Sequence, residues 1–172
     1  MAILQDKKIL LTGLLSNRSI AFGIGKALKR EGATLAFTYA GEAMKERVEK
    51  LAPELGGGLI MSMDVTKQDE IDGVFAKLGS EWGGVDGVVH SIGYAPREAI
   101  TGDFLDGLSR SSFMTAMDIS AYSFAALGKA ARPLMKGRNG AMLTLSYLGA
   151  VRSVPNYNTM GVAKAALEAN VR

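Results

Sequence analysis

Residues 8–30 read KILLTGLLSNRSIAFGIGKALKR, and this stretch decides the fold. The compact apolar run at residues 8–12 is typical of a buried strand. The apolar side chains that follow recur at helical spacing, at Ile20, Ile24, Ala27 and Leu28. Gly32 then offers a place for the helix to stop. The stretch therefore predicts a strand, a glycine-containing turn and a helix in succession.

The same succession repeats along the chain. Further short apolar runs, each of a length that suits a strand, occupy residues 34–39, 59–63, 85–90 and 141–145. Helical stripes stand between them, at Met44, Val48, Leu51 and Leu55, and at Ile71, Val74, Phe75 and Leu78. Strands that alternate with helices imply right-handed crossovers and a parallel sheet. We therefore predict an α/β fold, a doubly wound parallel sheet of five strands, in a single domain over residues 1–172.

Two further helices are predicted. The segment 112–134 is apolar on more than one face, which is typical of a helix buried in the core or against another subunit. Its large side chains fit no single stripe: Phe113, Met117, Tyr122, Phe124, Leu127 and Leu134. A last helix is predicted to begin near Asn156 or Tyr157 and to continue to residue 172.

The composition excludes several classes of function. Hydrophobic residues make up 48% of the chain and charged residues 22%, which is ordinary for a globular protein. Lys and Arg number 20 against 17 Asp and Glu, and a net charge of +3 is too small to indicate nucleic-acid binding. The absence of cysteine excludes disulfides and cysteine-based zinc sites. No secretory signal or apolar run of about 18 residues is present, so we predict a cytoplasmic protein without a membrane span.

Ligands of doubly wound sheets bind beyond the carboxyl ends of the strands, so the residues there are the first candidates. After the first strand, Gly13 and Ser19 flank a turn that feeds a helix, where backbone amides and the helix dipole suit a pyrophosphate. The spacing is not G-x-G-x-x-G, and an ordinary turn with an N-cap at Ser19 explains the same residues.

Two more strand ends carry candidates. Asp64, with Val65, follows the third strand and could accept a hydrogen bond from an adenine amine, although an N-cap at Asp64 or Thr66 explains it as well. Residues 90–96 read HSIGYAP, where a glycine lets backbone approach a ligand closely and small residues suit a nicotinamide ribose. His90 is the only histidine and is interpreted as structural, so no metal site or serine triad is predicted.

The last candidate pair is Tyr157 and Lys164, which follow the fifth strand. On a helix, seven residues turn about 700°, so the two side chains lie within about 20° of one face and about 10 Å apart along the axis. A phenol can donate a proton to an oxygen that gains negative charge, and an ammonium group can hold cofactor hydroxyls. As an isolated pair, they are better explained by an ordinary amphipathic helix with two exposed polar residues, because such pairs are common.

Taken together, these segments resemble the short-chain dehydrogenase/reductase superfamily and, within it, the enoyl-acyl-carrier-protein reductases of bacterial fatty acid synthesis. The matching segments cover nearly the whole chain: 13–23, 37–39, 64–65, 90–93, 118–123, 145–149, 155–158, 164 and 167–169. The most specific match is Tyr157-x6-Lys164, because most of the superfamily has Tyr-x3-Lys. In this chain the residue four after Tyr157 is Gly161, so the common form is absent.

The resemblance implies a Rossmann-type fold and a role for each matching residue. Tyr157 would stabilise an enolate, Lys164 would bind the nicotinamide ribose, and Tyr147 would be a second catalytic group beside the substrate. The remaining roles would fall to Gly13, Ser19 and Ile20 for the pyrophosphate, Asp64 and Val65 for the adenine, Ser91, Ile92 and Gly93 for the nicotinamide, and Ala95 for the acyl chain.

The function that the resemblance implies is reduction of the trans-2 double bond of enoyl-acyl-carrier-protein thioesters with NADH. The acyl-carrier protein would be the partner, and the protein would form a homotetramer. Two alternatives stay open: a ketoacyl-type short-chain reductase, against which the Tyr-x6-Lys spacing argues, and an inactive nucleotide-binding fragment.

Two features depart from the family pattern. Residues 39–41 offer no acidic side chain for an adenosine ribose, which leaves NADPH open as the cofactor. The chain ends at Arg172, inside the helix predicted to carry Lys164, whereas family members continue with a substrate-covering loop and further helices. We therefore expect a chain truncated at its C-terminus.

The Tyr-x6-Lys spacing predicts a preference for enoyl over carbonyl reduction. In enoyl reduction, charge develops at the far end of the conjugated system, and three residues of helix move the tyrosine by about 4.5 Å. A Tyr157→Phe, Met160→Tyr variant, which restores Tyr-x3-Lys spacing, should lose most oxidation of NADH by an enoyl thioester. Unchanged turnover would contradict this explanation.

Overall fold

The computed structural model describes residues 2–172, which form two compact units. The first unit comprises the residues up to Ser91 together with Gly128–Thr144. The second comprises Ile92–Leu127 and Leu145–Arg172.

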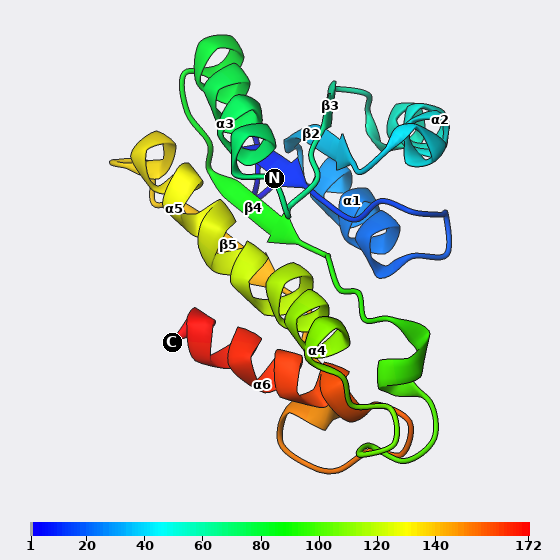
Figure 1. Cartoon of the computed structure of the whole chain (residues 1–172). Helices are drawn as coiled ribbons and strands as arrows, with labels where there is room; N and C mark the ends of the chain where they lie inside the picture. Colours follow the sequence, from blue (N-terminus) through cyan, green and yellow to red (C-terminus); the bar gives the residue numbers. More distant parts are fainter. Residues whose placement is uncertain (1) are drawn as a thin grey trace. The chain divides into compact units, whose positions relative to one another are not determined.

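The first unit contains the whole sheet (Figure 1). Its strands are β1 (Lys8–Leu11), β2 (Thr34–Tyr39), β3 (Leu59–Ser62), β4 (Gly87–His90) and β5 (Ala141–Thr144). Their order is β3-β2-β1-β4-β5, and every neighbouring pair is parallel. This confirms the predicted five-stranded parallel sheet. The chain order reverses between β1 and β4, so the topological switch point lies beside the central strand.

Helices cover both faces of this sheet. They are α1 (Ile20–Arg30), α2 (Glu42–Leu51), η1 (Ala52–Leu55), α3 (Gln68–Trp82) and the part of α5 (Ser123–Met135) that begins at Gly128. Ile9 and Leu11 of β1 join one buried cluster with side chains of α1 and α2. Leu10, between them, is fully buried and points to the opposite face. The fold is therefore doubly wound, as predicted.

The end of α1 shows why Gly32 follows it. Gly32 has a φ of +86°, in the left-handed region that favours glycine. Its N–H donates to the Lys29 carbonyl at 3.0 Å, and the next N–H, of Ala33, donates to the Leu28 carbonyl at 3.0 Å. These two bonds close the helix, which confirms the predicted stop.

The second unit is helical. It contains η2 (Arg97–Ile100), α4 (Arg110–Met117), a π-helical segment η3 (Asp118–Tyr122), the start of α5, η4 (Leu148–Ala150) and α6 (Asn158–Val171). They enclose a small apolar cluster of buried residues, namely Ala95, Ala99, Ala116, Met160 and Ala163. Among residues 2–172, no helix is both long and apolar enough to cross a membrane.

The prediction of one continuous helix over 112–134 is wrong in one respect. The π-helical segment η3 interrupts the α-helical hydrogen bonding between α4 and α5. The Asn170 side-chain amide donates to the carbonyl of Ala121 in this segment at 2.9 Å, so α6 supplies a partner for that carbonyl. Burial on several sides is also incomplete. Phe124 is buried, whereas 57% of Tyr122 is exposed.

Asp86 joins several parts of the first unit just before β4. Its carboxylate accepts hydrogen bonds from the Lys8 N–H at 3.0 Å, from Arg138 Nη2 at 3.0 Å and from Lys7 Nζ at 3.4 Å. Burial alone would raise the pKa of Asp86, but the bonds from Arg138 and Lys8 outweigh it and hold that pKa below its usual value. The carboxylate therefore links the starts of β1 and β4 to the turn before β5.

Asp86→Asn should destabilise the protein by about 1–3 kcal/mol near neutral pH, because the charged hydrogen bonds of Arg138 and Lys7 lose their acceptor. The lowered pKa contributes stability above the unfolded-state value of about 4, which is lost as the pH falls through the folded-state pKa. The difference between wild type and variant in urea unfolding should therefore shrink in acid. A difference that stays constant with pH would contradict this role.

Candidate active site

Gly13 and Ser91 meet at the carboxyl ends of β1 and β4. Gly13 has a φ of +74°, and a Cβ built there would overlap the carbonyl oxygen of Ser91. The Ser91 N–H donates to Thr12 Oγ1 at 3.2 Å, which continues the β1–β4 pairing past the strand ends. Only glycine fits this crossing. The structure therefore brings together two residues predicted to contact the cofactor.

Ser19 caps α1. Its Oγ accepts a hydrogen bond from the Phe22 N–H at 3.2 Å and donates to the Ser16 carbonyl at 2.7 Å. This confirms the N-cap interpretation that the sequence left open. The first turn of α1 contains no acidic residue that could neutralise the positive end of the helix dipole. Ile20, the first residue of this turn, is 67% exposed.

Asp64 closes the turn before α3. Its Oδ1 accepts hydrogen bonds from the Thr66 N–H at 3.0 Å and the Thr66 hydroxyl at 2.7 Å, and these bonds lower the pKa of Asp64. The N-cap position itself is Lys67, so the expectation of an N-cap at Asp64 or Thr66 is wrong by one residue or more. Val65 is buried. A contact of either residue with adenine stays a prediction.

His90 is fully buried at the end of β4. Its Nδ1 lies 2.8 Å from Thr144 Oγ1, and the Thr144 hydroxyl also lies within 3.3 Å of the His90 carbonyl. The ring therefore joins β4 to β5, in agreement with the structural role predicted for the only histidine.

In the second unit, the ring of Tyr157 rests on glycine backbone. A Cβ built at Gly149 would overlap Cδ1 of that ring, and a Cβ at Gly161 would lie 2.8 Å from the Gly149 carbonyl oxygen. The Tyr147 ring packs against Tyr157 with a centroid distance of 4.8 Å and an interplanar angle of 58°. Two glycines and a second tyrosine therefore form the seat of Tyr157.

The surroundings of Tyr157 disfavour its ionised form. Burial raises the pKa of the Tyr157 phenol, and the neighbouring Tyr147 raises it further. A phenol with a raised pKa keeps its proton at neutral pH and acts as a hydrogen-bond donor. Tyr157 precedes α6 as its N-cap residue, one position before the first helical residue, whereas the sequence placed the helix start at 156 or 157.

Lys164 lies in α6 with its side chain largely buried. Its ammonium group donates to the Leu145 carbonyl at 2.8 Å, and burial lowers its pKa. A Cβ built at Gly93 would lie 3.5 Å from Lys164 Nζ. Two residues predicted to contact the nicotinamide end of the cofactor thus lie side by side.

Ser120 lies in the matching segment 118–123, but the sequence assigned it no role. This fully buried residue of η3 accepts a hydrogen bond from the Tyr94 N–H and donates to the Tyr94 carbonyl, each at 2.9 Å. Both backbone polar groups of Tyr94 are therefore bonded to Ser120, which fixes the segment next to Gly93. The family resemblance marks the segment 118–123, but no residue pattern predicts the π-helical geometry that directs the Ser120 side chain toward Tyr94.

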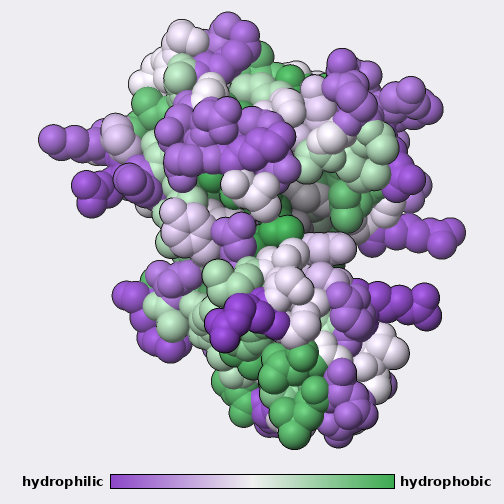
Figure 2. All heavy atoms as spheres, viewed as in Figure 1, coloured by the Kyte–Doolittle hydropathy of each residue, from purple (hydrophilic) through white to green (hydrophobic). Residues whose placement is uncertain are grey.

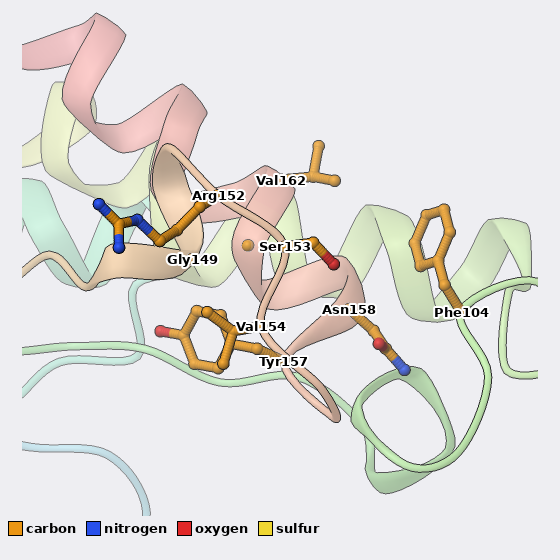
Figure 3. Close-up of a pocket in the computed structure, with 9 residues that line it drawn as sticks. Phe104, Gly149, Arg152, Ser153, Val154, Tyr157, Asn158 and Val162 are labelled. Carbon is orange, nitrogen blue, oxygen red and sulfur yellow. The ribbon is translucent and has the colours of Figure 1, made fainter.

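A pocket of about 310 Å³ adjoins Tyr157. Figure 3 shows Tyr157 and Phe104 at opposite ends of it, with Arg152 and Ser153 on the loop between η4 and α6. Ala95, predicted to border the acyl chain, is buried in the apolar cluster against which Tyr157 packs. Figure 2 shows hydrophobic side chains gathered on the second unit near the start of α6, where several large ones are exposed: Phe104, Leu105, Leu148, Val151 and Val162.

Comparison with known proteins assigns the family. Residues 13–172 match the family described as Enoyl-(Acyl carrier protein) reductase. The chain belongs to the enoyl-acyl-carrier-protein reductase family. The prediction of the family is thus confirmed.

Individual relatives of this family agree with the assignment. The enoyl-[acyl-carrier-protein] reductase [NADH] FabI of Neisseria meningitidis serogroup B is 60% identical over 172 residues, which are 100% of this chain and 66% of the relative. The protein of the same name from Escherichia coli K12 is 51% identical, again over 100% of this chain and 65% of the relative. The chain therefore spans about two thirds of the length of these relatives.

Solved structures of the family confirm the Rossmann-type fold. The crystal structure of enoyl-[acyl-carrier-protein] reductase (NADH) from Aquifex aeolicus VF5 has a TM-score of 0.95 at 50% identity, covering 98% of this chain and 67% of that one. The enzyme from Anaplasma phagocytophilum in complex with NAD has a TM-score of 0.94 at 43% identity, covering 98% of this chain and 64% of that one.

Gly149→Ala should displace the Tyr157 ring, because the added Cβ overlaps it. We expect a loss of about 1–3 kcal/mol in the free energy of unfolding and a changed near-ultraviolet circular dichroism signal of the tyrosine pair. Gly73→Ala in α3 is the matched control. A Cβ there meets no atom within 4 Å, so it should instead gain up to about 1 kcal/mol. Equal effects of the two substitutions would contradict the proposed seat.

Proposed function

We propose that the protein reduces the trans-2 double bond of enoyl-acyl-carrier-protein thioesters with NADH, the last reductive step of fatty acid elongation. The observation that carries this proposal is the pair Tyr157 and Lys164. The phenol is kept neutral on its glycine seat, and the buried ammonium group follows seven residues later in the same chain segment. The two relatives quoted above carry the name enoyl-[acyl-carrier-protein] reductase [NADH].

The residues fit a dinucleotide cofactor. The glycine crossing at Gly13 keeps side chains away from the carboxyl end of β1, and the capped start of α1 suits a pyrophosphate. We assign the pyrophosphate, adenine and nicotinamide ends to the three predicted sets: Gly13, Ser19 and Ile20; Asp64 and Val65; and Ser91, Ile92, Gly93 and Lys164. The relative from Anaplasma phagocytophilum contains NAD, which supports this assignment.

The bound nicotinamide would supply a hydride for the β carbon of the thioester. Negative charge then develops on the thioester oxygen, and the Tyr157 phenol would donate a hydrogen bond or its proton to that oxygen. Tyr147, whose ring packs on Tyr157, is a second candidate to contact the substrate. Lys164 would hold the ribose hydroxyls. Ala95 would border the acyl chain from the apolar cluster that Tyr157 also contacts.

A ketoacyl-type reductase is the less favoured candidate. That chemistry uses a tyrosine four residues before the lysine, and in this chain Met160 stands there, buried in the apolar cluster. A nucleotide-binding protein without turnover is the other alternative. The choice of NADH over NADPH rests on the relatives, because the two residues directly after β2, Ala40 and Gly41, carry no acidic side chain.

The acyl-carrier protein is the proposed carrier of the substrate. A homotetramer and a cytoplasmic location also stay proposals. Support for an assembly comes from apolar side chains that remain exposed on the helical segment 110–122, where Met114 is 63% and Tyr122 57% exposed.

The proposal predicts oxidation of NADH by an enoyl thioester and none by a ketoacyl thioester under the same conditions. Tyr157→Phe should lower kcat by about 10²- to 10⁴-fold, because the donor to the enolate oxygen is lost, and should leave NADH affinity unchanged. Lys164→Ala should lower kcat and, unlike Tyr157→Phe, should also weaken NADH binding. Oxidation by the ketoacyl substrate alone would favour the first alternative, and NADH binding without turnover would favour the second.

A further inference from the structure

Two asparagines flank Tyr157, and both have left-handed backbone. The φ of Asn156 is +60° and that of Asn158 is +40°, whereas Tyr157 between them has a φ of −101°. Asparagine tolerates the left-handed region better than most residues, but such angles are uncommon and need support from the surroundings.

That support comes from the backbone of one residue, Gly102. The N–H of Gly102 donates to Asn156 Oδ1 at 3.1 Å, and Asn158 Nδ2 donates to the carbonyl of Gly102 at 3.1 Å. The roles are fixed by chemistry, because an N–H requires an acceptor and a carbonyl requires a donor. Asn156 acts as the acceptor and Asn158 as the donor. Gly102, with a φ of +70°, presents both of its polar groups to them.

These two hydrogen bonds, from Asn156 and Asn158 to Gly102, form a clamp. Together with the backbone from Asn156 to Asn158, the clamp closes a small ring that contains Tyr157. The chain passes from Asn156 through Tyr157 to Asn158, and both ends are bonded to Gly102, more than fifty residues earlier in the sequence. Tyr157 is the N-cap residue of α6 but offers that helix no side-chain cap. The start of α6 is therefore fixed by the clamp, whereas α1 and α4 are capped by the serine at their N-cap position.

The clamp also reaches the wall of the pocket. Phe104 stands two residues after Gly102 and lines the pocket together with Tyr157 and Asn158 (Figure 3). The segment that carries Phe104 and the segment that carries Tyr157 thus share one pair of hydrogen bonds.

We propose that Asn156 and Asn158 are positioning residues, which bind the backbone N–H and the backbone carbonyl of Gly102 and thereby fix the direction of the Tyr157 phenol and its distance from the Phe104 wall of the pocket. The expected effect on kcat rests on the proposed function, whereas the expected effect on the position and titration of the Tyr157 ring does not.

Aspartate substitutions separate the two roles, because aspartate can accept but cannot donate when ionised. Asn156→Asp keeps the acceptor for the Gly102 N–H. Asn158→Asp removes the donor and sets a carboxylate against the Gly102 carbonyl. We expect Asn158→Asp to lower kcat for the enoyl thioester by about 10- to 100-fold, without a change in the KM for NADH. The loss with Asn156→Asp should be about tenfold smaller.

A second measurement needs no turnover. With tyrosine labelled with carbon-13 at Cζ, the Tyr157 signal is assigned by its absence in Tyr157→Phe and followed through an alkaline titration. Burial raises the pKa of Tyr157, so a ring released into water should titrate at lower pH. Each variant adds one carboxylate beside the ring, which by itself raises this pKa, so the lost donor is read from the difference between them: Asn158→Asp should titrate at lower pH than Asn156→Asp. Asn139→Asp is the matched control, an exposed asparagine with a φ of +53° in the first unit, and should titrate as wild type.

Equal kcat losses and equal titrations for the two aspartate variants would overturn the positioning role, as would a Tyr157 titration that neither variant moves. If Asn158→Asp does not fold, Asn158→Gly takes its place, since glycine keeps the left-handed backbone without the donor. If the wild-type protein does not oxidise NADH with an enoyl thioester, the proposed function fails, and the titration still decides the positioning role.

Discussion

The parallel pairing of β1 with two neighbours is the constraint on which the first unit depends. β1 pairs with β2 on one side and with β4 on the other, so both of its faces must be apolar and covered by helices. Leu10 and Leu11, which point to opposite faces, are both fully buried. The same pairing continues past the strand ends through Thr12 and Ser91 and leaves no room for a side chain at Gly13. The shape of the strand ends therefore follows from the packing of the sheet.

The sheet could be predicted from the sequence because a strand buried on both faces reads as a short apolar run. The run 34–39 became β2 with both ends as predicted, and the other strands ended within two residues of their predicted bounds. The π-helical segment could not be predicted, because it changes the hydrogen-bonding partner without changing the residue types. For the same reason, the bonds from Ser120 to Tyr94 and from Asn170 to Ala121 could not be predicted, although the segment 118–123 matched the family.

The candidate site was predictable only in part. Tyr157 and Lys164 were found from their spacing, which is a property of one chain segment. The seat of Tyr157 depends on Gly149 and Gly161, whose importance lies in a close approach between η4 and α6 that no local pattern encodes. Asp64 illustrates a different limit. One carboxylate can close a turn or bind a ligand, and the sequence supports both, whereas the structure shows the turn through Thr66.

Burial acts on Tyr157 and Lys164 in opposite directions. It raises the pKa of the phenol and lowers the pKa of the ammonium group, because in each case the neutral form is the one that tolerates loss of water. The shift of Tyr157 arises from burial and from Tyr147, without a contribution from Lys164. Lys164 instead donates to the Leu145 carbonyl. Burial therefore favours the neutral, hydrogen-bond-donating phenol over the phenolate, as the proposed role of Tyr157 as a donor to the substrate oxygen requires.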